Sequence, residues 1–282
     1  MKKYIYNLAL ISFLFFTIVL LLIFARVVVA KSVSWKLPLK EHILFLGASH
    51  VQDGINDEMI EGAKNWSRES ERYMFTYIKL KHVLSHNEQI DTIFLQLAPT
   101  DLWENTDYKY HTQNEQAGYL PLYWPHFDLE NWSVFLSEPF QAMGIICRNL
   151  LDFPESDAKS YRDKLGGYFK NKDVMDINKV YPQLIQADNY GHNENYKYLR
   201  YIIELCNSRG IKLYFLYCPT FHVDYYYDET YFYNAYKNYF SDVELLDYSR
   251  MPVNADERAD AGHLNYKGAI RFTNVLKSRF GF

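Results

Sequence analysis

Cysteine and net charge are both scarce in this chain. The 282 residues include only three cysteines, Cys147, Cys206 and Cys218, and no two of them form a Cys-x-x-Cys pair. This pattern excludes a disulfide-built scaffold and a cysteine-based zinc cluster. A net charge of -4 and a pI near 6.1 provide no basic surface for nucleic acid. We therefore expect no metal, no other cofactor and no nucleic-acid partner.

Apolar residues, by contrast, are abundant. Hydrophobic residues make up 49% of the chain and charged residues 23%, so the chain can bury a sizeable core and is too apolar to be disordered. Aromatic residues reach 18%, with 26 tyrosines. A tyrosine packs its ring on apolar surfaces while its hydroxyl stays polar, which suits sugar stacking as well as ordinary cores and surfaces. The composition predicts one folded domain after an N-terminal segment.

The first thirty residues contain one long apolar run. Residues 8–25 carry no charge, and as a helix at about 1.5 Å per residue they would span roughly 27 Å, close to the thickness of a bilayer core. Lys2 and Lys3 precede the run, as in a signal anchor or a signal peptide. A cleavage site could be built from Val28-Val29-Ala30, but the run is long for a cleaved signal. We expect residues 1–30 to be a retained, single-pass membrane anchor.

The expected orientation of this anchor follows from the size of the folded domain rather than from the charges that flank the apolar run. Arg26, Lys31, Lys36 and Lys40 come after the apolar run and oppose the positive-inside rule. Large domains, however, translocate largely regardless of loop charge, and the segment before the run is very short. We therefore expect a cytoplasmic N-terminus at the plasma membrane, with the folded domain outside it, in the periplasm or at the cell surface.

From Glu41 onward, short apolar runs alternate with longer amphipathic stretches. This alternation predicts an α/β domain with a mainly parallel sheet. The expected strands are 42–46, 63–66, 92–98, 211–217 and 243–246. The expected helices are 55–62, 70–86, 140–151, 194–206, 229–240 and 265–280. Between about 102 and 190 the periodicity weakens and aromatic residues accumulate, which predicts a packed, aromatic-rich insertion within a domain of residues 41–282.

Two short blocks place reactive residues where open α/β sheets build their sites, in the loops that follow strands. Gly47-Ala48-Ser49-His50 follows the first expected strand, and Asp260-Ala261-Gly262-His263 precedes the last expected helix. A serine hydroxyl needs a nearby base to become a nucleophile, and an imidazole base needs a carboxylate to fix its tautomer. We expect Ser49 to be the nucleophile, His263 the base and Asp260 its orienting carboxylate.

The two blocks resemble those of the SGNH (GDSL-like) hydrolase superfamily, in which the nucleophile follows the first strand and an Asp-x-x-His block lies near the C-terminus. Here the blocks read FLGASH and DAGHLNYKGA, and the similarity covers the chain from about Glu41 to its end. The resemblance implies a flavodoxin-like three-layer α/β sandwich. It is closest to membrane-anchored bacterial members that are associated with acylation of extracellular polysaccharides or wall polymers.

The residues that would complete an oxyanion hole depart from the family pattern. The family uses a glycine after the second strand and an asparagine after the third, where this chain has Asn65-Trp66-Ser67-Arg68 and Ala98-Pro99-Thr100-Asp101. Thr100 falls on the asparagine position, and its hydroxyl can still donate, although loss of one good donor typically costs about 10²–10³ in rate. The residues expected to line the site are His50, Asn65, Ser67, Thr100 and Asp101.

These observations predict a serine-dependent esterase or O-acyltransferase that acts on acyl esters of an extracytoplasmic glycan or envelope polymer. The resemblance also implies a membrane-bound acyltransferase as a partner that passes acyl groups across the membrane. An alternative from another class is a catalytically weak or inactive SGNH-like module that binds glycan or organises a membrane assembly. Lipid hydrolysis is a third reading. The acyl group, the acceptor and the oligomeric state are left open by the sequence.

Overall fold

The computed structural model describes residues 1–102, 113–136, 138–151, 163–179, 194–221 and 229–282. The chain divides into two compact units. One unit combines Met1–Ser34 with Tyr110–Lys164, and the other combines Trp35–Lys109 with Leu165–Phe282. The second unit contains every strand described and every residue expected at the site.

The larger unit is built on a five-stranded, all-parallel sheet with the strand order β2-β1-β3-β4-β5. Its strands are β1 (Ile43–Leu46), β2 (Ala63–Asn65), β3 (Thr92–Gln96), β4 (Lys212–Tyr217) and β5 (Glu244–Asp247). The strand order reverses direction between β1 and β3, and open sheets place their sites at the carboxyl ends of strands beside such a reversal. The predicted flavodoxin-like parallel α/β fold is therefore confirmed.

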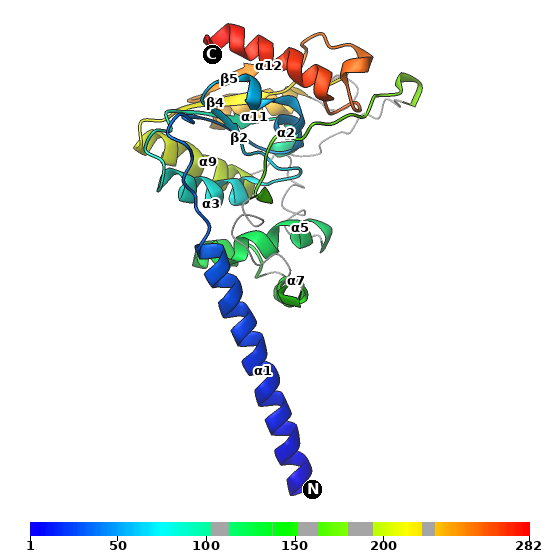
Figure 1. Cartoon of the computed structure of the whole chain (residues 1–282). Helices are drawn as coiled ribbons and strands as arrows, with labels where there is room; N and C mark the ends of the chain where they lie inside the picture. The colour runs from blue at the N-terminus through cyan, green and yellow to red at the C-terminus, as the bar shows by residue number, and fades with distance from the viewer. Residues whose placement is uncertain (103–112, 137, 152–162, 180–193, 222–228) are drawn as a thin grey trace. The chain divides into compact units, whose positions relative to one another are not determined.

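Helices cover both faces of this sheet, so the unit has three layers (Figure 1). Its helices are α2 (Ser49–Gly54), α3 (Tyr73–Leu84), α9 (Glu194–Ser208), α11 (Glu229–Tyr239) and α12 (Tyr266–Phe280). α2 and α12 contact each other on one face, while α3 and α9 contact each other on the other face. Short 3-10 turns connect these elements, namely η1 (Asp57–Met59), η2 (Pro99–Asp101), η5 (Ile177–Lys179) and η6 (Ala255–Glu257).

The core follows the two-residue period of the strands. Alternate strand side chains point to opposite faces, and β1 is buried on both, so its sequence ILFL is apolar throughout. The face under α2 and α12 is one continuous apolar cluster. Its strand and helix members include Ile43, Phe45, Val51, Phe94, Tyr214, Leu216, Leu246, Phe272 and Leu276.

One predicted helix is wrong. Residues 55–62 were expected to be helical, but the helix begins at Ser49 and ends at Gly54, and only the short η1 turn follows it. The reason is a tertiary contact. The side-chain amide of Asn65 donates to the carbonyls of Val51 and Ile55 at 3.0 and 2.8 Å, which ends α2 and turns the chain toward β2.

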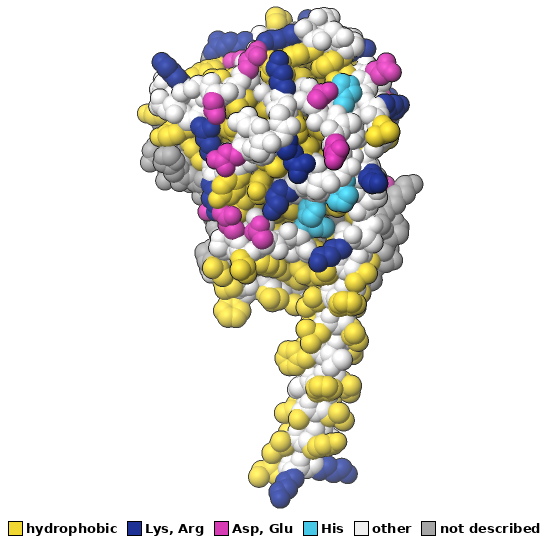
Figure 2. All heavy atoms as spheres, turned by 90° about the vertical axis from the view of Figure 1, so that its left-hand side faces the viewer, with side chains coloured by type: hydrophobic (Ala, Val, Ile, Leu, Met, Phe, Trp, Pro, Cys, Tyr) yellow, Lys and Arg dark blue, Asp and Glu magenta, His cyan; other side chains and the backbone are white. Residues whose placement is uncertain are grey.

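The smaller unit contains the long N-terminal helix. Its elements are α1 (Lys2–Lys31), α5 (Gln113–Tyr123), η4 (Trp124–His126), α6 (Leu129–Ser133) and α7 (Pro139–Leu151). Hydrophobic side chains cover α1 along most of its length, and Lys2 and Lys3 begin it (Figure 2). α1 is long and apolar enough to cross a membrane, as an anchor or as a signal sequence. Part of the predicted insertion, 113–151, thus belongs with α1, whereas 103–112, 152–162 and 180–193 lie outside the described residues.

Candidate active site

Ser49 is the first residue of α2 and lies directly beyond the carboxyl end of β1. The turn between them depends on Gly47, whose φ of 141° is one that side-chain-bearing residues rarely adopt. A Cβ at this position would also collide with Cβ of Gln96 on the neighbouring strand. Glycine therefore lets β1 and β3 approach closely while the chain turns to present Ser49.

The backbone around Ser49 is held by Gln96, the last residue of β3. The Oε1 atom of Gln96 accepts hydrogen bonds from the N–H groups of Ala48 and Val51 at 3.0 and 3.4 Å. Its Nε2 atom donates to Asp101 at 3.2 Å, which fixes the orientation of the amide. Gln96 was not among the residues expected at the site. A polar residue at the end of an otherwise apolar strand could have indicated it, because a buried amide must hydrogen-bond to nearby groups.

Ser49, His263 and Asp260 form one chain of hydrogen bonds. His263 Nε2 lies 2.8 Å from Ser49 Oγ, and His263 Nδ1 lies 2.9 Å from each carboxylate oxygen of Asp260. When Nδ1 carries the proton, it donates to Asp260 and leaves Nε2 free to accept the Ser49 hydroxyl. The structure thus brings together the three residues that were expected to act as nucleophile, base and orienting carboxylate.

The electrostatics of the pair favour charge on both partners. Burial alone would raise the pKa of the Asp260 carboxyl, but the hydrogen bond to His263, the charge of His263 and two backbone N–H groups bring it below its usual value. Burial alone would lower the pKa of His263, but the hydrogen bond and charge of Asp260 raise it above its usual value. An imidazole whose pKa is raised this way is a better proton acceptor from a serine hydroxyl.

A short loop before α12 presents Asp260 and His263. Asp260 Oδ1 accepts from the N–H groups of Gly262 and His263 at 2.7 and 2.9 Å, so the carboxylate also folds its own loop. The buried Asn265 then closes the loop: Oδ1 caps the start of α12, and Nδ2 donates to three backbone carbonyls. Asn265 was not among the expected site residues and was expected as the first residue of the helix 265–280, whereas it caps a helix that begins at Tyr266.

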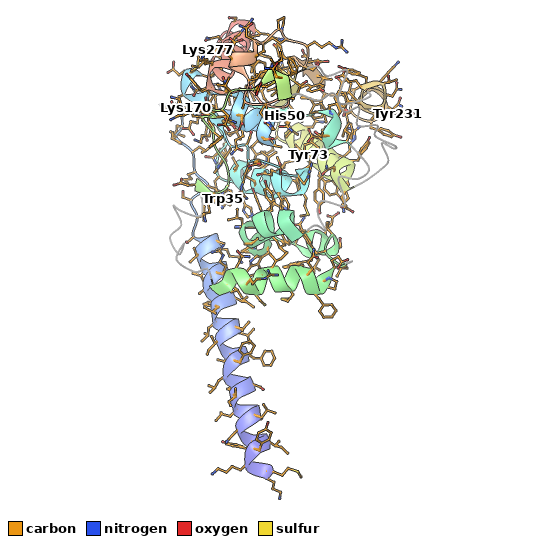
Figure 3. All side chains as sticks on the ribbon, turned by 90° about the vertical axis from the view of Figure 1, so that its right-hand side faces the viewer. Trp35, His50, Tyr73, Lys170, Tyr231 and Lys277 are labelled. Carbon is orange, nitrogen blue, oxygen red and sulfur yellow. The ribbon has the colours of Figure 1, made fainter. Side chains whose placement is uncertain are left out.

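His50, labelled in Figure 3, lies beside the reacting pair. Its ring meets that of His263 edge-to-face at a centroid distance of 5.0 Å. Burial, and next the charge of His263, lower the pKa of His50 to about 3. Its Nδ1 atom is buried, and none of the described residues hydrogen-bonds to it. His50 is therefore a neutral neighbour that packs against the base.

Three of the expected oxyanion-side residues have their polar side chains engaged in the scaffold. The amide of Asn65 ends α2 and accepts from the N–H of Ser67 at 3.0 Å. The hydroxyl of Ser67 is buried and donates to the carbonyl of Phe45 at 3.4 Å. The carboxylate of Asp101 accepts from Gln96 and from the N–H of Ala98. These side chains support the turn around Ser49.

Thr100 differs from these neighbours. It lies half-buried in η2, beyond the end of β3, and its hydroxyl makes no hydrogen bond within the part of the chain that the structure describes. The N–H of Ser49 is a second unengaged donor, because the first N–H groups of a helix have no intrahelical acceptor. Within the described residues, the Thr100 hydroxyl and the Ser49 N–H therefore both lack a hydrogen-bond acceptor.

A second carboxylate, Asp53, acts on His263 through its charge. Asp53 is buried on α2 and accepts from Asn171 Nδ2 at 2.9 Å. Burial raises the pKa of the Asp53 carboxyl, against the opposing effects of Asn171 and His263, and the negative charge of Asp53 contributes to the raised pKa of His263. Asn171 belongs to a segment that is held beside α2 by a hydrogen bond from the N–H of Phe169 to the carbonyl of Gln52.

A fully buried ion pair supports the same side of the site. Lys79 and Glu71 are both inaccessible to solvent and lie 2.9 Å apart. The ammonium group of Lys79 also donates to the carbonyls of Trp66 and Leu165. These two carbonyls belong to the loop after β2 and to the segment that passes α2. Lys79 therefore links the loop that contains Ser67 to the segment that begins at Leu165.

No group of three His, Cys, Asp or Glu side chains is arranged as metal ligands within the described residues.

Comparison with known proteins adds the following. A protein-family model matches residues 173–281, the stretch that includes Asp260 and His263. No curated protein matches the chain. Among solved structures, the chain is similar to a Bacteroides fragilis protein provisionally assigned as an acylhydrolase, with 8% identity, a TM-score of 0.39, and coverage of 89% of this chain and 92% of that one. A Streptococcus pneumoniae protein provisionally assigned as a platelet activating factor has 14% identity and the same TM-score of 0.39, with coverage of 95% and 98%.

Proposed function

We propose that this chain is a serine-dependent esterase or O-acyltransferase of the SGNH kind. The observation that carries the proposal is the unbroken hydrogen-bond chain from Ser49 Oγ through His263 to Asp260. Each link is within the reach that proton transfer from a nucleophile to a base requires.

In the proposed reaction, Ser49 Oγ attacks the carbonyl carbon of an acyl ester while its proton passes to His263 Nε2. The tetrahedral adduct then collapses, the bond to the alcohol breaks, and the departing oxygen takes the proton from His263. The acyl group is now an ester of Ser49. Water (for hydrolysis) or a second hydroxyl (for transfer) then attacks the acyl carbon while its proton passes to His263 Nε2. The bond between the acyl group and Ser49 Oγ breaks, and Ser49 Oγ takes the proton back from His263. Asp260 keeps Nδ1 protonated and balances the charge of the imidazolium.

The oxyanion of the adduct needs donors aimed at the place where its charge develops. We assign this role to the N–H of Ser49 and to the hydroxyl of Thr100, because the side chains of Asn65, Ser67 and Asp101 are engaged elsewhere. The family pattern described above adds a glycine and an asparagine as donors, so this site has fewer donors for the oxyanion. We therefore expect slow turnover that is limited by stabilisation of the oxyanion.

The proposed substrate is an acyl ester of an extracytoplasmic glycan or envelope polymer. α1 supports a location at a membrane if it is retained as an anchor, with the larger unit in the periplasm or at the cell surface. The family resemblance supports the polymer substrate and a membrane-bound acyltransferase as a partner. The high tyrosine content suits stacking on sugar rings.

Replacement of Ser49 tests the enzyme directly. Ser49→Ala removes the nucleophile, and turnover of aryl acetates and acetylated sugars should fall by about 10⁴–10⁶-fold. A fluorophosphonate probe should label the wild-type protein and leave Ser49→Ala unlabelled. Ser278→Ala, which changes an exposed serine on α12, is the matched control and should behave as wild type. Absence of both labelling and turnover in the wild-type protein would overturn the proposal.

A second candidate function is a binding module with an SGNH-like fold and little catalysis. The engagement of Asn65 and Ser67 in the scaffold favours it, since the amide and the hydroxyl that could donate to an oxyanion there are used within the protein. Such a module would bind acetylated glycan with the same affinity in wild type and Ser49→Ala, and neither protein would react with fluorophosphonate.

A further inference from the structure

The apolar surface of α7 is partly buried and partly exposed. One part is buried within its unit and contains Ala142, Ile145, Ile146 and Leu150. The other part is exposed and contains Phe140, Met143 and Cys147, at helical spacings of three and four residues. Leu136, in the turn before the helix, is also exposed. The apolar face of a helix in a folded domain is normally buried, so the exposed part of this face calls for a partner.

We name Leu136, Phe140, Met143 and Cys147 the α7 patch. The exposed fractions of the first three are 71%, 91% and 53%. Large apolar side chains that are exposed singly are ordinary, whereas several on and next to one short helix mark an interaction surface. The polar residues of α7, namely Gln141, Arg148 and Asn149, lie off this patch.

The position of α7 on α1 identifies the partner. α7 contacts both α1 and α5, and it lies across α1 (Figure 3). Within this unit, α5 lies on the side of α7 that is farther from the N-terminal end of α1 (Figure 1). Large apolar side chains of α1 are exposed from Tyr4 to Phe24, and burial begins near Arg26, which donates to the carbonyl of Pro121. α7 therefore meets α1 at the end of its exposed apolar run.

We infer that the α7 patch lies in the lipid–water interface of the membrane that α1 spans, so that α7 rests on the bilayer beside its anchor. This inference rests on the proposed retention of α1 as an anchor. If residues 8–25 occupy the bilayer core, the end of that run marks its boundary, and a helix packed there lies at interfacial depth. An apolar stripe on a helix in this plane buries its side chains at the boundary between headgroups and acyl chains. The patch then continues the lipid-facing surface of α1.

Cys147 provides a native reporter for this surface. It is exposed, whereas Cys206 and Cys218 are buried, so a thiol-reactive fluorophore should attach selectively at the patch in the folded chain. The full chain is labelled in detergent and reconstituted into phosphatidylcholine vesicles that contain nitroxide lipids, labelled either at the headgroup or at mid-chain. Headgroup nitroxide should quench the Cys147 probe more than mid-chain nitroxide, and aqueous iodide should quench it weakly. Phe140→Ser with Met143→Ser should reduce the quenching by lipid and increase that by iodide.

A probe on α1 separates failure of the inference from failure of the anchor. Phe13→Cys in a Cys147→Ser background places the probe at an exposed position of the apolar run, where mid-chain nitroxide should quench it most. Quenching at Phe13→Cys with an iodide-accessible Cys147 probe would overturn the inference and leave the anchor intact. If neither probe responds to lipid nitroxides, the anchor and the inference both fail, while ester turnover still reports separately on Ser49.

Two other occupants would give different results. If a second copy of this chain covers the patch, pyrene at Cys147 should form excimers in vesicles, and the lipid nitroxides should have little effect. If a partner protein covers it, the Cys147 probe should be accessible to iodide in vesicles that contain this chain alone. Either result would overturn the assignment to lipid.

Discussion

The two sides of Ser49 are built differently. On the His263 side, polar side chains hydrogen-bond to one another and end on the reacting hydroxyl. On the side of β2 and β3, polar side chains hydrogen-bond mainly to backbone and hold the turn, as Asn65 and Gln96 do. The first side is arranged for proton transfer, and the second is arranged for rigidity. Residues of similar chemistry at the same sheet edge therefore differ in what substitution should do to activity and to stability.

The largest effect after that of Ser49→Ala is expected at Asp260. Asp260→Asn removes the charge that fixes the tautomer of His263, so kcat/KM for an aryl acetate should fall by about 10²–10⁴-fold. The side chain of Asp260 is 59% exposed, so water can partly replace it and the upper figure is a ceiling. A change in kcat/KM below threefold would show that Asp260 contributes little to the action of His263 as a base.

The next effect tests the oxyanion side. Thr100→Ala removes a hydroxyl donor, and kcat should fall by about 10²–10³-fold with little change in KM if that hydroxyl binds the oxyanion. Thr100→Ser keeps the hydroxyl and should retain most activity. Thr100→Asn would place an amide donor there and should restore or increase kcat. Equal kcat values for all three variants would show that the Thr100 hydroxyl does not stabilise the oxyanion.

The pH dependence reports on His263. A general base must be neutral, and the pKa of His263 is raised above its usual value of about 6.5 by Asp260. The value of kcat/KM should thus be constant above this raised pKa and fall about tenfold per pH unit below it. Asp260→Asn should move the inflection to lower pH. An inflection below pH 6 in the wild-type protein would contradict the assigned charges.

The smallest effect on activity and the clearest effect on stability are expected at Asn65. Asn65→Ala leaves the buried carbonyls of Val51 and Ile55 without their donor, so the free energy of unfolding should fall by about 1–3 kcal/mol. Asn274→Ala, an exposed change on α12, is the control and should stay within about 0.5 kcal/mol. Denaturant titration measures both. A loss of activity without a loss of stability at Asn65 would place it among the oxyanion donors instead.

Much of the fold was readable from the sequence because burial imposes simple patterns. The apolar runs of β1, β3 and β4 predicted strands within a residue or two of their bounds, and Asn265 begins the last helix as a cap. The unbroken apolar run of α1 predicted a long helix that could cross a membrane. The error at 55–62 arose because the side chain of Asn65, on the next strand, hydrogen-bonds to the carbonyls of Val51 and Ile55 and overrides the local preference.

The candidate site divides in the same way. The sequence by itself determined which residues carry reactive groups and that Ser49 and the Asp260–His263 block lie in loops beside a parallel sheet, because nucleophile, base and carboxylate are recognisable by residue type and by position after a strand or before a helix. Only the tertiary structure decided that His263 Nε2 lies 2.8 Å from the hydroxyl of Ser49, 214 residues away. The tertiary structure likewise decided that the side chains of Asn65, Ser67 and Asp101 hydrogen-bond within the scaffold. Residue type states what a side chain can donate or accept, whereas its partner depends on which stretches of chain the fold brings within about 3 Å.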